Sequence, residues 1–165
     1  MIFFRLDECV AYKIALAAET IGIPQSVAFE APQLLAQKGV EDVAWMEAFA
    51  KRGKATDLRV VFSSDGMMRH REPERMAAIN AGLIVFYAPK AAFWRQLRKR
   101  GQAAYFLRWF DTMLALAAAG TPGDQYQLPP SFSANPALRP MPPMTNVVRK
   151  GRPPKAKKPS KIRLI

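Results

Sequence analysis

Acidic side chains stand where two apolar segments of the sequence end. Asp7 and Glu8 follow the first apolar run, Asp65 follows another run near the middle of the chain, and Asp42 opens a segment of helical spacing between them. If the two runs are neighbouring strands of a parallel sheet, Asp7 and Asp65 emerge side by side. Two carboxylates about 4 Å apart repel by about 4 kcal/mol at an effective dielectric constant of about 20. Such a cluster needs a cation, or one of its members must stay protonated.

The ligand types indicate which cation fits. Carboxylates without histidine or cysteine partners suit hard divalent ions, Mg²⁺ or Mn²⁺, better than zinc. Such ions usually keep several waters and bind substrate phosphate together with one or two carboxylates. The alternative is structural, because Asp7, Asp42 and Asp65 each stand at an expected helix start or turn and can act there as an N-cap or turn residue. The spacing leaves a shared metal site and separate capping roles open.

The segments that must position these acids alternate between strands and helices. The expected strands are continuous apolar runs, which is typical of a parallel sheet buried on both faces by helices. In such sheets ligands bind at the carboxyl ends of the strands, where the acids stand. We expect one α/β domain over residues 1–128, with strands at 2–6, 25–30, 58–62, 83–87 and 125–128, and helices at 9–21, 41–52, 73–81 and 91–119, the last of them broken near Gly101.

Composition narrows the class of protein further. The chain has 165 residues and a formal net charge of +12, so we expect an anionic partner such as nucleic acid. Its single cysteine, Cys9, cannot form an internal disulfide, and with one histidine, His70, a Cys/His zinc site is excluded. We expect Cys9 to be a small core residue and His70 to be an exposed loop residue rather than a general base.

No signal peptide or membrane-spanning run is visible, which predicts a cytoplasmic protein without a membrane partner.

A basic loop follows the acid at residue 65. Arg69 and Arg71 stand where positive charge can meet a phosphate backbone beside an acidic centre. They can equally pair with Glu72 or Glu74 on the surface, where ion pairs contribute little stability. The sequence leaves both roles open.

Short motifs, taken in order, resemble those of PIN-like domains. Residues 3–8 (FFRLDE) are similar to their hydrophobic strand followed by Asp-Glu, and residues 41–45 (EDVAW) to their Asp-opened helix. Residues 60–65 (VVFSSD) resemble their strand followed by Ser/Thr-x-Asp, and residues 71–75 (REPER) fit what comes next. The order and spacing cover roughly residues 1–128, and the resemblance is greatest to the branch that includes VapC-type toxins. It implies a PIN-like three-layer α/β/α fold with a mostly parallel sheet of four to five strands.

The resemblance also implies a function. It is that of a Mg²⁺- or Mn²⁺-dependent endoribonuclease, the toxin of a type II toxin–antitoxin system, with RNA as substrate, an antitoxin protein as partner and a homodimeric assembly. Carried over by position, Asp7, Asp42 and Asp65 are the metal-binding and catalytic acids, and Glu8 is a fourth catalytic acid. Many PIN domains have an amide residue at the position of Glu8. Ser63 matches the Ser/Thr that helps to orient the site.

The C-terminal segment differs in composition from the rest. Residues 125–165 carry 9 basic and no acidic side chains and 9 of the 14 prolines, so we expect residues 129–165 to form an extended or disordered basic tail. Its stretch 149–153 (RKGRP) resembles an AT-hook, which implies contact with DNA, whereas charge alone indicates generic contact with nucleic acid or an acidic partner. The expected nucleic-acid contacts in the tail are Lys150, Arg152, Lys155, Lys157 and Lys158.

The sequence therefore supports two functions of different classes. The first is the metal-dependent endoribonuclease, and the second is a catalytically inactive PIN-like protein that binds nucleic acid through its basic, AT-hook-like tail. A third function, phosphoryl transfer to a small molecule by the same acids, finds no glycine-rich phosphate loop in the sequence to support it.

Overall fold

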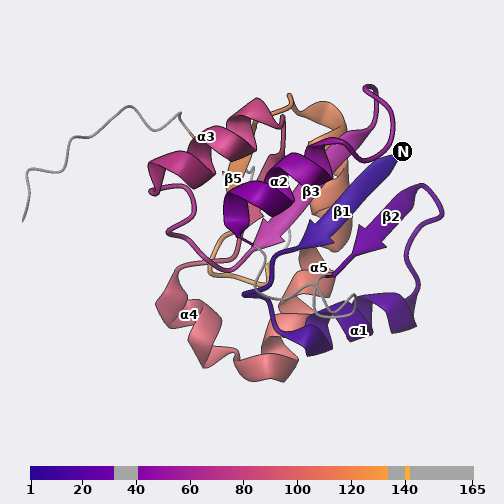
Figure 1. Ribbon diagram of the computed structural model, residues 1–165. Coiled ribbons are helices and arrows are strands. Elements are labelled where there is room, and N and C mark those ends of the chain that lie inside the picture. Colours follow the sequence, from indigo (N-terminus) through magenta and orange to yellow (C-terminus); the bar gives the residue numbers. More distant parts are fainter. Residues whose placement is uncertain (32–40, 134–139, 142–165) are drawn as a thin grey trace, which may run out of the picture.

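The computed structural model describes residues 1–31, 41–133 and 140–141. Its centre is a sheet of five strands, which are β1 (Ile2–Leu6), β2 (Val27–Glu30), β3 (Leu58–Ser63), β4 (Ile84–Tyr87) and β5 (Gln125–Gln127). The strands lie in the order β2-β1-β3-β4-β5, and every neighbouring pair is parallel (Figure 1). The α/β fold with a parallel sheet, predicted from the continuous apolar runs, is confirmed.

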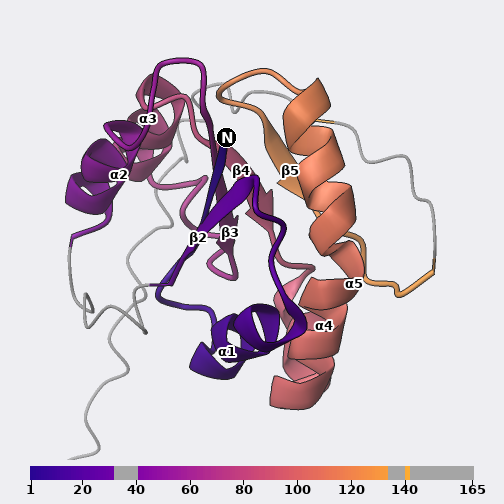
Figure 2. The ribbon, with the colours of Figure 1, turned by 90° about the vertical axis from the view of Figure 1, so that its right-hand side faces the viewer.

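Helices cover both faces of this sheet. One face carries α2 (Asp42–Ala50) and α3 (Glu72–Asn80), and the other carries α1 (Tyr12–Ile21), α4 (Ala91–Gln96) and α5 (Arg98–Ala119) (Figure 2). This is the three-layer α/β/α arrangement that the resemblance implied. Within the described ranges, none of the helices is long and apolar enough to cross a bilayer.

The central strands are apolar on both sides because each side meets a layer of helices. Successive strand residues point to opposite faces, so Phe62 belongs to the core under α4 and α5, while Val61 and Val85 belong to the core under α2 and α3. The ring of Phe62 lies 5.1 Å from that of Phe106 and 5.9 Å from that of Trp94, measured between centroids. The residue directly before the end of β3 is therefore held by α4 and α5 together.

The predicted break in the last long helical segment lies at a different residue. The helix is interrupted at Leu97 and not at Gly101, because Arg98 has a φ of 49°, in the left-handed region that residues with side chains rarely adopt. Gly101 lies inside α5, where an added Cβ would meet the Cβ of Leu97 at 3.1 Å. Gly101 therefore serves close packing at the junction of α4 and α5, and the turn itself is made at Arg98.

Residues 129–133 lie against α5. The hydroxyl of Tyr105 donates to the carbonyl of Pro129, the indole N–H of Trp109 donates to the carbonyl of Ser131 at 3.3 Å, and the ring of Phe132 meets that of Tyr105 at 5.4 Å. Apart from residues 140–141, the remainder of the predicted tail lies outside the described residues, and the domain boundary at residue 128 stays a prediction.

Gly53 allows the chain to turn from α2 back into β3, and its replacement tests this turn. Gly53 has a φ of 69°, and an added Cβ would collide with the ring of Phe3 and the carboxylate of Asp57. We expect Gly53→Ala to lower the free energy of unfolding by about 1–3 kcal/mol, measured by urea denaturation. Gly66→Ala is the control, because a Cβ at Gly66 meets nothing within 4 Å. Equal stability of the two variants would contradict the role given to Gly53.

Candidate active site

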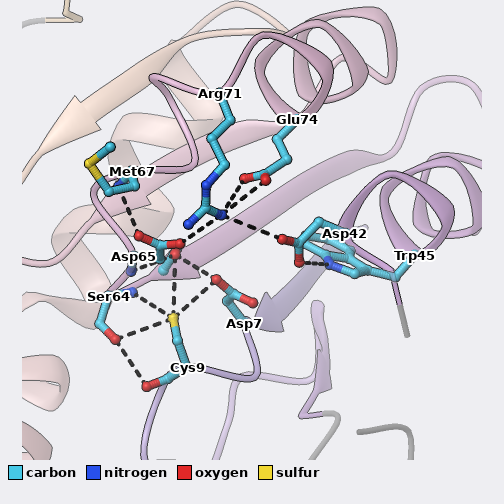
Figure 3. A network of polar contacts seen from close by, with 10 residues as sticks. Asp7, Cys9, Asp42, Trp45, Ser64, Asp65, Met67, Arg71 and Glu74 are labelled. Carbon is cyan, nitrogen blue, oxygen red and sulfur yellow. Dashed lines mark hydrogen bonds and ion pairs between the residues drawn. The ribbon is translucent and has the colours of Figure 1, made fainter. Parts of the chain in front are cut away.

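The register of the sheet brings the two predicted strand ends together. β1 and β3 are direct neighbours, with Leu6 paired to Phe62, and the backbone N–H of Asp7 donates to the carbonyl of Phe62 at 3.0 Å. Asp7 and Ser63 therefore leave the sheet at the same carboxyl edge. The sequence interpretation depended on strands 2–6 and 58–62 being neighbours, and this condition holds, so residues far apart in sequence lie at one edge of the sheet (Figure 3).

Asp7 is the most buried acid of the group, with 5% of its surface exposed. One oxygen, Oδ2, accepts hydrogen bonds from the hydroxyl of Ser63 at 2.6 Å and from the thiol of Cys9 at 3.1 Å. Burial raises the pKa of Asp7 above its usual value, the nearby charge of Asp42 raises it further, and these hydrogen bonds oppose the rise. Asp7 is thus the acid of the group that gains most from a cation beside it.

Ser63 connects the ends of the two strands. It is completely buried, and its hydroxyl donates to Asp7 while accepting a hydrogen bond from the backbone N–H of Asp65 at 3.0 Å. One hydroxyl therefore fixes the position of the first acid and the direction in which the chain leaves β3 toward the second. These contacts are compatible with the orienting role that the resemblance implied for Ser63, which stays a prediction.

Asp65 combines a turn with an ion pair. Its Oδ1 accepts the backbone N–H of Met67 at 2.8 Å, which is the local contact expected of a turn aspartate. Its other oxygen lies 3.2 Å from Nη1 of Arg71. Asp65 therefore makes the turn contact with one oxygen and the ion pair to Arg71 with the other, so its turn role leaves an oxygen turned toward the other acids.

Asp42 reaches the same edge from the first turn of α2. It does not cap that helix through its side chain, since the N-cap position is held by Glu41 and no side-chain cap bond is formed. The indole N–H of Trp45 donates to its Oδ1 at 3.1 Å, and its Oδ2 lies 3.9 Å from Nη1 of Arg71. Trp45 therefore holds one oxygen of Asp42 and leaves the other turned toward Arg71 (Figure 3).

Arg71 is the cation around which these acids gather. Its Nη1 lies within ion-pair distance of Asp42, Asp65 and Glu74, the last at 2.9 Å (Figure 3). The pKa of Arg71 is raised by its hydrogen bond to Glu74 and by the charge of Asp65. Glu74 did not appear among the predicted site residues, although its place three residues after Arg71 at the start of α3 is the signal that would have found it. Of the two roles open for Arg71, the structure shows pairing with acids, Glu74 among them.

The other nominated residues near the site differ in their involvement. Glu8 and His70 are exposed, as expected for the histidine, and the guanidinium of Arg69 lies against the sulfur of Met141.

The expectation that Cys9 is a core residue is wrong, because the residue is exposed and its thiol contacts Asp7 and Ser64. Although the residue as a whole is exposed, its sulfur is withdrawn from water among these contacts, and this desolvation, with the charge of Asp7 beside it, raises the pKa of Cys9 to about 12. The thiol is therefore a hydrogen-bonding group and not a thiolate nucleophile.

The side chains at this edge suit a hard cation, and a guanidinium group now stands among them. Within the described ranges, no three acidic, histidine or cysteine side chains converge closely enough to hold a metal ion as they are arranged. Arg71 is instead a stand-in cation that draws the oxygens of Asp42 and Asp65 toward one point. Carboxylate oxygens are ligands that hard divalent cations prefer, and in the described arrangement the place between Asp42 and Asp65 is taken by Arg71.

The nucleic-acid contacts predicted for the tail are not part of this geometry. Lys150, Arg152, Lys155, Lys157 and Lys158 lie outside the described residues. Among the described cations near the site, Arg71 pairs with the acids, and Arg69 belongs to the same loop.

Comparison with known proteins gives one match. The family model of a PIN-like domain matches residues 1–90, which is more than half of the chain and includes Asp7, Asp42, Asp65 and Arg71. No curated protein and no solved structure matches the chain.

The raised pKa of Asp7 predicts how stability changes with pH. The folded protein holds the Asp7 proton more tightly than the unfolded chain does, so stability is lost as pH rises above the usual aspartate value of about 4. The loss is complete above the raised pKa. In the presence of EDTA, Asp7→Asn should therefore be more stable than the wild type at pH 7 and gain no advantage near pH 3.5, measured by urea denaturation.

Asp57→Asn provides a control of opposite sign. Hydrogen bonds from the backbone N–H of Lys54 and from the N-terminal amine lower the pKa of Asp57. Asp57 therefore stabilises the fold above its usual pKa, and this contribution is lost as pH falls through the lowered value. Asp57→Asn should be less stable than the wild type at pH 7. The account of Asp7 is wrong if both variants lose stability at pH 7.

Proposed function

The chain belongs to the PIN-like domain family, and from this premise we propose that it is a Mg²⁺- or Mn²⁺-dependent endoribonuclease. PIN domains are generally nucleases, so membership of the family supports cleavage of nucleic acid as the broad class of reaction. The observation that supports the proposal most is that Asp7, Asp42 and Asp65 reach one edge of the sheet from three different elements and that two of them already share a cation. Capping or turn roles alone do not require such a convergence.

The reaction is hydrolysis of an RNA phosphodiester bond. Water adds to phosphorus and one P–O bond breaks, so that one fragment keeps the phosphate and the other gains a hydroxyl group. A divalent ion bound at such a site activates the attacking water and offsets the charge that develops on the phosphate oxygens. Asp7, Asp42 and Asp65 would hold the ion, and the exposed Glu8 is a fourth candidate acid.

The remaining side chains position these ligands. The Ser63 hydroxyl fixes Oδ2 of Asp7, and the Trp45 indole fixes Oδ1 of Asp42. Arg71, half exposed at the mouth of the acid cluster, is the group that can exchange a carboxylate for a substrate phosphate. Its release from Asp65 would free an acid for the ion and a cation for the substrate at the same time.

We further infer that the chain is the toxin of a type II toxin–antitoxin pair and that it forms a homodimer. The VapC-like order of motifs in the sequence supports the toxin role. Exposed apolar side chains on α1, Tyr12 and Leu16, are 47% and 45% exposed and offer a contact for a protein partner. Expression in cells should arrest growth, and co-expression of the antitoxin should restore it.

The second candidate function is a nucleic-acid-binding protein without catalysis. The specific observation in its favour is that the Arg71 guanidinium stands among Asp42, Asp65 and Glu74 and offsets part of their negative charge without a metal ion. Cleavage assays on the full chain separate the two functions, because a binding protein leaves RNA intact at every concentration of Mg²⁺ or Mn²⁺.

Two single substitutions test the catalytic proposal. Asp7→Asn and Asp65→Asn keep the size of each side chain but remove the charge that would hold the ion. We expect each to reduce RNA cleavage in Mn²⁺ at least about 100-fold, the lower end of what such groups contribute, without lowering the thermal midpoint. Asp57→Asn is the matched control, since Asp57 pairs with the N-terminal amine and should leave cleavage unchanged. Full activity of both site variants would eliminate the proposed role.

Competition between Arg71 and the ion gives a second test that does not depend on activity. Without Arg71 the acids lose their balancing charge, so Arg71→Ala should melt at a lower temperature than the wild type in EDTA. Addition of Mn²⁺ should raise its melting temperature more than it raises that of the wild type. Arg69→Ala, in the same loop, should respond to Mn²⁺ as the wild type does. An equal response of Arg71→Ala and the wild type would show that the ion and Arg71 do not share a place.

A further inference from the structure

Positive charge is concentrated on one short part of the described chain. Residues 75–110 contain seven basic and no acidic side chains. Five of them stand around the junction of α4 and α5 and are exposed, and none of the five forms an ion pair with any residue in the described ranges. We call them the α4–α5 basic surface: Lys90, Arg95, Arg98, Lys99 and Arg100.

This surface begins beside the acid cluster. The backbone N–H of Ala88 donates to the carbonyl of Ser63 at 2.8 Å, and Lys90 follows only two residues later, within about 7.6 Å along the Cα trace. Both ribbon views place α4 beyond the carboxyl ends of the strands, on the side of the sheet where the acids emerge (Figures 1 and 2). The Lys90 end of the basic surface therefore lies close to the end of β3, from which Ser63 and Asp65 emerge.

Packing fixes α4 in this position. The ring of Trp94 meets that of Phe62, and the side-chain amide of Gln102 donates to the carbonyl of Trp94 at 2.8 Å. The left-handed turn at Arg98 then redirects the chain into α5 and places three consecutive cations at the corner. The positive charges of the α4–α5 basic surface are therefore on helices that pack against the core, and not on an unpacked loop.

The chemistry of this surface indicates phosphate recognition and not base recognition. The rings of Trp94 and Tyr105 are buried, at 8% and 0% exposure, and the partly buried ring of Phe93 is packed edge-on against Tyr105, with 5.9 Å between centroids, so these rings do not form an open stacking platform for bases. The exposed large apolar side chain that lies against α5 is Phe132, at 43% exposure and in contact with Tyr105, and a single ring does not form an apolar face of the kind that inserts into a membrane. Exposed cations without rings or apolar anchors suit a polyanion in water.

We propose that the α4–α5 basic surface binds the sugar–phosphate backbone of single-stranded RNA and guides the strand to the acids. The inference rests on the proposed function for its substrate and adds the attraction that the acid cluster cannot provide, because carboxylates repel phosphate. Asp42 and Asp65 have side chains only 35% and 32% exposed, and Asp7 is buried. A flexible single strand reaches such recessed acids more readily than a stiff duplex does.

The test is the salt dependence of RNA binding by the full chain. The probe is a fluorescein-labelled single-stranded oligouridine, titrated in EDTA between about 50 and 200 mM salt so that binding is measured without cleavage. The two test variants are Lys99→Gln with Arg100→Gln, and Lys90→Gln with Arg95→Gln. The matched control is Lys51→Gln with Lys54→Gln, which removes the same charge from exposed residues at the opposite edge of the sheet.

Each test variant should bind RNA more weakly than the control. The slope of log K against log salt should become shallower by up to about 1.4, which is about 0.7 for each phosphate that the variant no longer neutralises. Replacing oligouridine by oligoadenosine should not change this difference, because the surface binds the backbone and not the bases. Slopes equal to that of the control in both test variants would overturn the proposal.

Two further measurements separate the alternatives. If the test variants keep their affinity for RNA but lose binding to vesicles that contain anionic phospholipid, the surface serves a membrane and the proposal is wrong. If wild-type protein shows no cleavage in Mn²⁺ while the test variants still bind RNA more weakly than the control, the proposed function fails and the binding surface stands. The proposed nuclease function and the proposed RNA-binding surface are therefore contradicted by different results.

Discussion

Carboxylates that gather at one edge of a parallel sheet must be balanced by positive charge, and this constraint governs the site. Asp7 is buried with its pKa raised, Asp42 lies close enough to add to that rise, and Asp65 and Glu74 complete the group. Arg71 supplies part of this balance by bridging three of the four. The fold that brings these acids together therefore also forms a position that favours a cation. The group in that position, Arg71 or a metal ion, determines which acids are available to bind a metal.

The sheet gives the site its precision. Ser63 at the end of β3 joins Asp7 to the backbone of Asp65, and the same strand is packed through Phe62 against α4. Binding and catalysis are thus proposed for groups that share one rigid support, with negative charge at the strand ends and positive charge on α4 and α5. A polyanion can be held by the second group while its phosphate is presented to the first.

The sequence was informative where local pattern determines structure. Continuous apolar runs predicted the parallel sheet, because they depend on strand periodicity, and the strand ends that carry Asp7 and Asp65 are neighbours joined through Ser63. The pairing of Arg71 with Glu74 and two aspartates depends on the path of a loop without periodicity, so it stayed one of two alternatives. The break at Leu97 was missed for a similar reason, since a left-handed Arg98 carries no composition signal, whereas Gly101 does.

The central claim is that Asp7, Asp42 and Asp65 share one divalent ion in the place that the Arg71 guanidinium now holds. The most direct measurement is an anomalous difference map from crystals of the full chain grown with Mn²⁺. The account predicts a peak among the oxygens of these three acids, with Arg71 withdrawn from Asp65. A map without a peak at this edge, with Arg71 still paired to Asp65, would contradict it.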